Sequence, residues 1–234
     1  MSDEMTNSLM FLLRWLHFFF GIIWIGHLYY FNFTQGAFMA EADAGTKIGV
    51  SSKLLPRALW WFRWGAMWTA VTGLLYMGLR GHQAKSFAIF VDNSWGIWIT
   101  IGALLGLTMF ANVWLIIWPN QQVVIKSAQQ VAAGGQALPE AAAAGAKALL
   151  ASRTNTLFSI PMLFFMGAAS HLPLAVDPES SPVGLAFALA GIVWLLVEFN
   201  ALFGKLGPLT TIRGVISSGF ALTAILYASV AIVL

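Results

Sequence analysis

The chain has 234 residues, of which 59% are hydrophobic and only 9% are charged. A soluble globular domain carries roughly 25% charged residues, so this composition indicates an integral membrane protein. The net charge of +3 is small and is spread over the loops, which gives no indication of a nucleic-acid partner. The absence of cysteine excludes disulfides, cysteine-ligated metals, iron–sulfur clusters and covalently attached c-type haem.

Six apolar segments follow one another along the chain, each about long enough to cross a hydrocarbon core roughly 30 Å thick. Inside lipid every backbone N–H and C=O must be satisfied within the segment, so each is predicted to be a helix. In chain order they are about Leu9–Gln35, Ala58–Leu79, Trp95–Trp118, Asn155–His171, Val183–Phe203 and Gly214–Leu234. The predicted fold is an all-α, polytopic bundle of about six transmembrane helices, with residues 1–234 forming a single membrane domain in the lipid bilayer.

Prolines mark two places where the helices are expected to be irregular. Pro161 lies inside the short fourth segment, which predicts a kink there or the loss of a turn at one end. The longest connection, residues 120–152, is rich in alanine, and Pro139 suits the start of a short cytoplasmic helix within it. We interpret residues 120–152 as a partly helical cytoplasmic connector; a docking surface for a soluble partner is the alternative.

The distribution of lysine and arginine predicts the orientation. Eight basic residues lie in the first, third and fifth loops, and three lie on the opposite side. The eight are Lys47, Lys53, Arg57, Lys126, Lys147, Arg153, Lys205 and Arg213, and the three are Arg14, Arg80 and Lys85. Because loops in the cytoplasm carry the excess of basic residues, both termini are predicted to lie outside. The expected location is a bacterial inner membrane.

Three of the four histidines are predicted near the outer face of the bundle. His17 lies about two turns inside the first helix, His171 ends the fourth, and His82 follows the second. Two imidazoles at one depth suggest a b-type haem, with His17 as one ligand to the haem iron and His171, or less favourably His82, as the other. Arg14 lies one turn above His17 and is placed to meet a haem propionate. The alternative is that the histidines hydrogen-bond between helices and that Arg14 is an interfacial anchor.

Two charged residues are predicted in the inner half of the bundle. Arg63 of the second helix and Glu198 of the fifth both fall one to two turns inside the inner boundary. A lone charge at that depth is expensive, so the sequence predicts an ion pair between them. A structural latch and a proton-handling site are both open as its purpose. Asn155 belongs to a set of asparagines in the spans that would extend this polar region.

Several stretches together resemble the membrane domain of bacterial membrane-bound urate hydroxylase, the urate oxidase N-terminal family. They are LLRWLHFFFGIIWIGHLYYFNFTQ (12–35), LLPRALWWFRWGAMWTAVTGLLYM (54–77), NVWLIIWPNQQ (112–122) and SRTNTLFSIPMLFFMGAASH (152–171). The resemblance covers the first five spans. It implies oxidation of urate to 5-hydroxyisourate, with electrons leaving to a cytochrome c that forms a C-terminal domain outside the membrane in the family.

This sequence ends at Leu234 without a Cys-x-x-Cys-His motif, so any cytochrome c is expected as a separate chain. His17, His82 and His171 carry over from the resemblance as candidate haem ligands. Arg63, Arg153 and Asn155, together with Asn120 and Gln121, are of the residue types that would hold a planar polar anion such as urate. No residue identifies itself as the catalytic base. The alternative function is a non-catalytic accessory subunit of a larger respiratory or photosynthetic membrane complex.

Overall fold

The computed structural model describes residues 3–234, and all regular elements in that range are helical. The α-helices are α1 (Asp3–Tyr29), α2 (Gly36–Glu41), α3 (Ala44–Gly49), α4 (Leu55–Gln83), α5 (Ser94–Asn112), α6 (Trp118–Ala132), α7 (Ala141–His171), α8 (Val183–Phe203) and α9 (Ile212–Ala231). Three π-helical turns, η1 (Tyr30–Gln35), η2 (Val50–Leu54) and η4 (Val113–Ile117), and two 3₁₀ turns, η3 (Phe87–Phe90) and η5 (Gly207–Thr210), complete the set.

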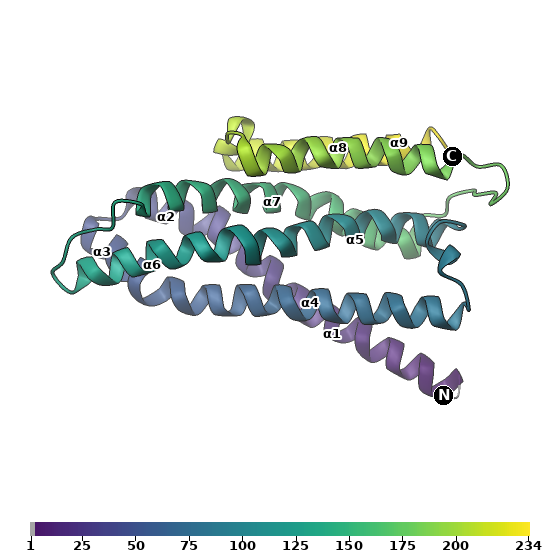
Figure 1. Cartoon of the computed structure of the whole chain (residues 1–234), viewed down its shortest axis with the longest axis horizontal. Helices are drawn as coiled ribbons and strands as arrows, with labels where there is room; N and C mark the ends of the chain where they lie inside the picture. The colour runs from purple at the N-terminus through teal and green to yellow at the C-terminus, as the bar shows by residue number, and fades with distance from the viewer. Residues whose placement is uncertain (1–2) are drawn as a thin grey trace.

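The long helices run alternately up and down the bundle. α1, α4, α5, α7, α8 and α9 follow one another in opposite directions, and both chain ends lie at the same end of the bundle (Figure 1). α5 continues through η4 into α6 as one run of 39 residues. At 1.5 Å per residue this run is about 58 Å long, so its α6 end extends well beyond a 30 Å hydrocarbon core.

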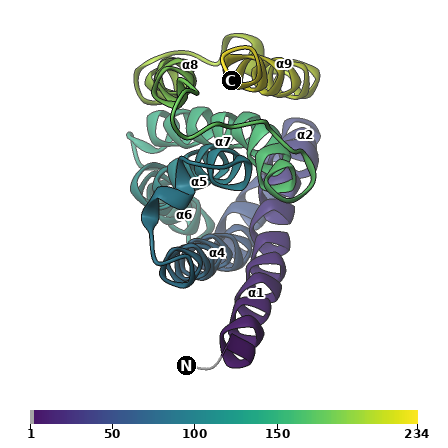
Figure 2. The ribbon, with the colours of Figure 1, turned by 90° about the vertical axis from the view of Figure 1, so that its right-hand side faces the viewer.

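The helices are stacked in layers. α8 and α9 cover one side of α7 and α5, and α4 and α1 lie on the other side (Figures 1 and 2). Aromatic rings fill the space between α5, α7 and α9: Trp98 stacks on Phe165 and on Tyr227, with ring centres 5.5 Å and 5.7 Å away. The indole N–H of Trp98 donates to the carbonyl of Leu172 at 2.9 Å, so this buried ring is also satisfied as a donor.

Four helical runs are long and apolar enough to cross a membrane: Glu4–Glu41, Ser94–Ala132, Val183–Phe203 and Ile212–Ala231. They agree with the first, third, fifth and sixth predicted spans. α4 and α7, with 29 and 31 residues, are as long but are less apolar. Their polar residues are largely turned inward, since Thr69, Thr72, Thr154, Asn155 and Ser159 are all buried.

α7 is one long helix, whereas the sequence predicted a short helix after Pro139 and a separate span around Pro161. It begins at Ala141, two residues after Pro139, and runs without interruption through Pro161 to His171. The separate short cytoplasmic helix is therefore the first part of α7 itself. Pro161 is buried, and near it the Ser159 hydroxyl donates to the carbonyl of Thr156 at 2.7 Å. Local hydrogen bonds and packing of this kind allow proline inside a membrane helix.

α1 and α4 pack closely at Gly65. A Cβ at Gly65 would lie 3.0 Å from the backbone nitrogen of Trp24 and 3.0 Å from the Cγ2 of Ile23. Contact with backbone cannot be relieved by a side-chain rotation, so a larger residue here would have to move the two helices apart. This contact fixes the register in which α1 presents its side chains to α4.

Candidate functional site

His17 is held between α1 and α4. Its Nδ1 lies 2.9 Å from the carbonyl oxygen of Thr69 and 3.5 Å from the Thr72 hydroxyl. Gly73 makes room for the ring, because a Cβ there would come within 2.9 Å of the His17 Cε1. With Nδ1–H donating to a backbone carbonyl, Nε2 is the nitrogen left to act as a ligand, which is the usual arrangement for a metal-binding histidine. The His17 imidazole therefore fits the role of one axial ligand.

Arg14 lies above His17 on the same side of α1. Its guanidinium donates to the hydroxyl of Tyr76, and its central carbon lies 5.0 Å from the centre of that ring. The side chain is exposed. Arg14 is thus held next to His17 by α4, at the place expected for a residue that would meet a haem propionate.

His171 and His82 lie on other elements and are both exposed. The hydroxyls of Tyr29 and Ser159 form a hydrogen bond of 2.9 Å that fixes the register of α1 against α7. His17 is twelve residues before Tyr29 and His171 is twelve residues after Ser159, so both lie roughly 18 Å from that contact toward the same end. The first half of α1 leans away from α7, and His17 contacts α4 instead (Figure 2). His17 and His171 therefore lie at about the same height along the bundle, but His17 packs against α4 and not against α7, the helix that carries His171.

The predicted ion pair between Arg63 and Glu198 is wrong. The guanidinium carbon of Arg63 lies 3.9 Å from the centre of the Trp118 ring, and no ion pair joins it to Glu198 in the described part of the chain. α4 and α8 lie on opposite sides of the α5–α7 layer (Figure 2), so equal depth does not bring the two residues together. The Arg63 guanidinium makes a cation–π contact with the face of the Trp118 indole, which is a favourable interaction for a cation.

Glu198 belongs to a chain of amides between α5, α7 and α8. The Nδ2 of Asn112 donates to Glu198 Oε2 at 3.1 Å and to Asn155 Oδ1 at 3.0 Å. Asn155 in turn donates to the carbonyl of Met109 at 2.9 Å. Asn112 and Asn155 are 2% and 0% exposed, so these bonds satisfy polar groups that have left water entirely. Asn155 therefore joins α7 to α5, and it uses one donor and one acceptor of its amide in doing so.

Six side-chain polar atoms are buried without a hydrogen-bond partner among the described residues. Two of them, Trp24 Nε1 and Arg80 Nε, lie on α1 and α4. The other four lie on η1, η4, α6 and α7, and they are Gln35 Oε1, Trp114 Nε1, Gln121 Oε1 and an Arg153 guanidinium nitrogen. Together with Arg63, the residues of these four atoms are called the inner polar cluster here. Buried polar groups are nearly always paired, so each of the four atoms is open to a hydrogen bond with water or a ligand.

A series of contacts places the inner polar cluster at one level of the bundle. Asn32, three residues before Gln35, donates to the hydroxyl of Ser152, the neighbour of Arg153, at 2.9 Å. The rings of Phe31 and Phe62 meet at 5.4 Å, next to Asn32 and Arg63 respectively. The contacts that complete the level are Trp64 with Trp114 at 5.6 Å and Arg63 with Trp118, one turn before Gln121. Residues from η1, α4, η4–α6 and α7 therefore lie at this level.

Two of the three π-helical turns contribute residues to the inner polar cluster. η1 carries Gln35 and η4 carries Trp114. π-helical turns are frequent at functional sites, and the extra residue in the turn re-aims side chains that a regular helix would place elsewhere. Sequence reasoning missed Gln35 and Trp114 as site residues. The available signal was spacing, since each lies within one turn of a polar or aromatic residue already considered, Asn32 and Trp118.

The inner polar cluster offers two acceptors and two donors, with the positive charges of Arg63 and Arg153. Such a set complements a planar anion that itself has both N–H donors and carbonyl acceptors. No group of three or more histidine, aspartate and glutamate side chains suited to a metal ion occurs in residues 3–234. The cluster therefore combines hydrogen-bond donors, hydrogen-bond acceptors and positive charge.

A family model described as Urate oxidase N-terminal matches residues 85–226, more than half of the chain. The chain belongs to this family. No curated protein and no solved structure matches it.

The matched range starts after α4 and reaches into α9. It contains His171, Arg153, Asn155 and the π-helical turn η4, and so includes three of the five residues of the inner polar cluster. α1 and α4, with His17 and Arg14, lie before it. The range is thus displaced toward the C-terminus relative to the first five spans in which the resemblance was recognised.

Proposed function

We propose that this chain is a membrane oxidoreductase of the urate hydroxylase type, which oxidises urate or a closely related planar anion. The family membership and the unpaired polar atoms of the inner polar cluster carry this proposal. The reaction adds water to urate and gives 5-hydroxyisourate, two protons and two electrons. The membrane domain therefore has to bind the anion, accept protons and pass electrons on.

The proposed topology has six crossings, formed by α1, α4, α5, α7, α8 and α9, with both termini outside. The alternating helix directions and the excess of Lys and Arg in the odd loops support it. The chain has no native cysteine, so single cysteines report topology cleanly. In intact cells an impermeant maleimide should label Glu179→Cys and leave Gln136→Cys unlabelled. The reverse labelling would overturn the orientation.

We assign the substrate to the inner polar cluster. Arg153 and Trp114 would donate to the anion, the Gln35 and Gln121 carboxamides would accept its N–H groups, and Arg63 would supply charge from its seat on Trp118. Loss of one charge-assisted hydrogen bond corresponds to about tenfold to hundredfold weaker binding. Arg153→Met should therefore weaken urate binding by that factor, and Lys147→Gln, which removes an exposed charge from the same helix, should not.

We assign a b-type haem to His17, with His171 as the proposed second ligand and Arg14 at a propionate. A haem bound there would supply one-electron transfer toward an external cytochrome c. The chain's own contribution is to orient the His17 imidazole through the Thr69 carbonyl and to leave Nε2 available. The His17 level and the inner polar cluster are about 22 Å apart along α1, the rise from His17 to Asn32. The two assignments are therefore tested separately.

One set of spectra tests the redox proposal. Purified protein should show a b-type α band after chemical reduction, and His17→Ala should lose it while remaining folded. Addition of urate without oxygen should reduce the haem in wild-type protein. A colourless folded protein would overturn the haem assignment and leave an accessory membrane subunit. A haem that is reduced chemically but not by urate would overturn the assignment of urate as the substrate.

A further inference from the structure

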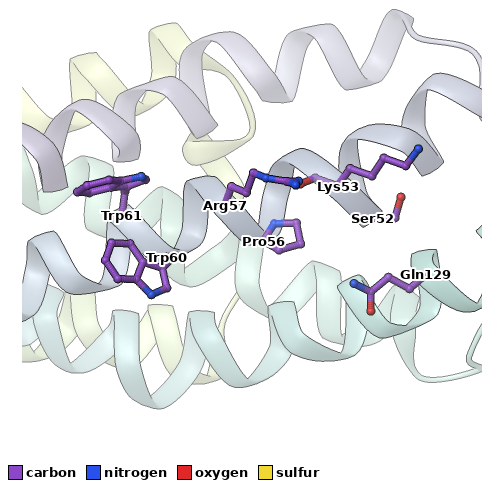
Figure 3. A pocket seen from close by; sticks show the side chains of 7 residues that line it. All are labelled: Ser52, Lys53, Pro56, Arg57, Trp60, Trp61 and Gln129. Carbon is purple, nitrogen blue, oxygen red and sulfur yellow. The ribbon is translucent and has the colours of Figure 1, made fainter.

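A groove on the surface of α4 changes from basic to aromatic along its length. Its basic part has a volume of ≈ 680 Å³ and is bordered by Ser52, Lys53, Arg57, Trp60, Trp61 and Gln129. Figure 3 shows Ser52 and Gln129 at one end of this part and the two tryptophans at the other. Trp60 and Trp61 also border a second hollow of ≈ 340 Å³ toward Trp64 and Trp68. The two hollows therefore form one continuous groove.

The basic end is complementary to an anion. Lys53 and Arg57 are both exposed, and the Arg57 guanidinium donates to the backbone carbonyl of Lys53, which holds the guanidinium beside the Lys53 backbone. No acidic side chain is among the described residues that border the groove. Gln129 adds an amide from α6 across the groove. Unopposed paired cations next to a membrane attract acidic headgroups.

The aromatic end lies at the depth of acyl chains. From Arg57 to Trp68 the helix rises about 16 Å, roughly half of a 30 Å hydrocarbon core. Phe20 and Ile23 of α1 form the opposite wall there, and the surface is almost entirely apolar. Trp60, Trp61 and Trp68 stay 45–53% exposed, so their rings face outward and not into the bundle. A chain in this part of the groove would lie in van der Waals contact with rings from two helices.

We propose that this groove binds one anionic phospholipid. Lys53 and Arg57 hold its phosphate, and one acyl chain lies along Trp60, Trp61 and Trp68 against Phe20. The site lies on the lipid-facing surface of α4 and is distinct from the inner polar cluster. It depends on the proposal that the chain spans a membrane, and it is independent of the proposed redox function.

Native mass spectrometry of protein stripped of lipid and mixed with phosphatidylglycerol or phosphatidylcholine tests the proposal. Wild-type protein should retain one phosphatidylglycerol in preference to phosphatidylcholine. Two interfacial cations together correspond to about 30-fold in affinity, so Lys53→Gln with Arg57→Gln should weaken retention by that factor. The matched control, Lys147→Gln with Lys205→Gln, removes the same charge from exposed positions outside the groove and should retain the lipid.

Quenching of tryptophan fluorescence by brominated phosphatidylglycerol locates the acyl chain. The fraction quenched at low lipid ratios should fall in Trp60→Phe with Trp61→Phe, and brominated phosphatidylcholine should quench less at the same ratio. Equal retention of both lipids, unchanged retention in the Lys53 and Arg57 variant, or displacement by a quinone would each overturn the proposal. The first would indicate a slot for any lipid chain, and the last would indicate a quinone site.

Discussion

The guanidinium carbon of Arg63 lies 3.9 Å from the centre of the Trp118 indole, a contact that joins α4 to α6. This contact replaces the ion pair expected from depth alone. An arginine on an indole keeps its charge and its hydrogen-bond donors while losing most of its water. Arg63 can therefore approach an anion without first breaking a salt bridge.

Arg63 and Glu198 should contribute to stability independently of each other. Arg63→Ala, Glu198→Gln and the double variant can be compared by equilibrium unfolding in mixed micelles. Residues that are separated and share no partner add within about 0.5 kcal/mol, whereas paired residues couple by about 0.5–3 kcal/mol. A coupling well above 0.5 kcal/mol would contradict the contacts described here.

Asn155 should matter more for stability than for substrate binding. In Asn155→Leu, the buried Asn112 amide loses its acceptor on α7 and keeps only Glu198, so the free energy of unfolding should fall by about 1–2 kcal/mol. Asn120→Leu is the control, because Asn120 donates only to the carbonyl of Ile116 in its own helical run. Its effect should stay within about 0.5 kcal/mol. Equal losses would argue against a special role for the α5–α7 contact.

The sequence predicted the helices well because apolar length is a strong and local signal. Val183–Phe203 was predicted with the bounds that α8 has. Packing partners were not predictable in the same way. Depth follows from residue number along one helix, but which helices are neighbours depends on the arrangement of all of them, and α8 packs on α5, α7 and α9, away from α4. The ion pair between Arg63 and Glu198 was predicted wrongly because depth alone does not specify which helices are neighbours.

The π-helical turns were also not predicted from the sequence. η1 and η4 lie inside continuous helical runs; Gly36 follows η1 directly and Pro119 is the second residue after η4, but neither residue type specifies a π-helical turn. The extra residue in each turn shifts every later side chain around the helix axis. The candidate substrate residues, Arg63, Arg153 and Asn155 among them, were chosen by residue type and predicted depth, and this choice omitted Gln35 and Trp114.

The amino end of α3 should respond to acid. Two hydrogen bonds from Thr46, one from its hydroxyl and one from its backbone N–H, hold the pKa of Asp43 below its ordinary value. A lowered folded-state pKa means that the stabilisation is present above the ordinary pKa and is lost as the pH falls through the lowered one. The protection factors of the amides of residues 44–49, measured against the intrinsic exchange rate at each pH, should therefore fall at acid pH in wild type. Asp43→Asn should flatten this pH dependence. An unchanged pH profile would contradict the role of the Asp43 carboxylate as the N-cap of α3.

Gly73 should be needed for the position of His17. A Cβ at residue 73 would lie 2.9 Å from the His17 Cε1, whereas nothing lies within 4 Å of the Cβ position at Gly78 on the same helix. Gly73→Ala should lower the free energy of unfolding by about 1–3 kcal/mol through overpacking. Gly78→Ala should raise it by about 0.5–1 kcal/mol, because alanine is the better helix residue. If haem is bound at His17, Gly73→Ala should also shift its absorbance maximum while Gly78→Ala leaves it in place. Opposite signs of the two stability changes would establish that α4 is shaped around the imidazole, and a stabilising Gly73→Ala would contradict the His17 placement.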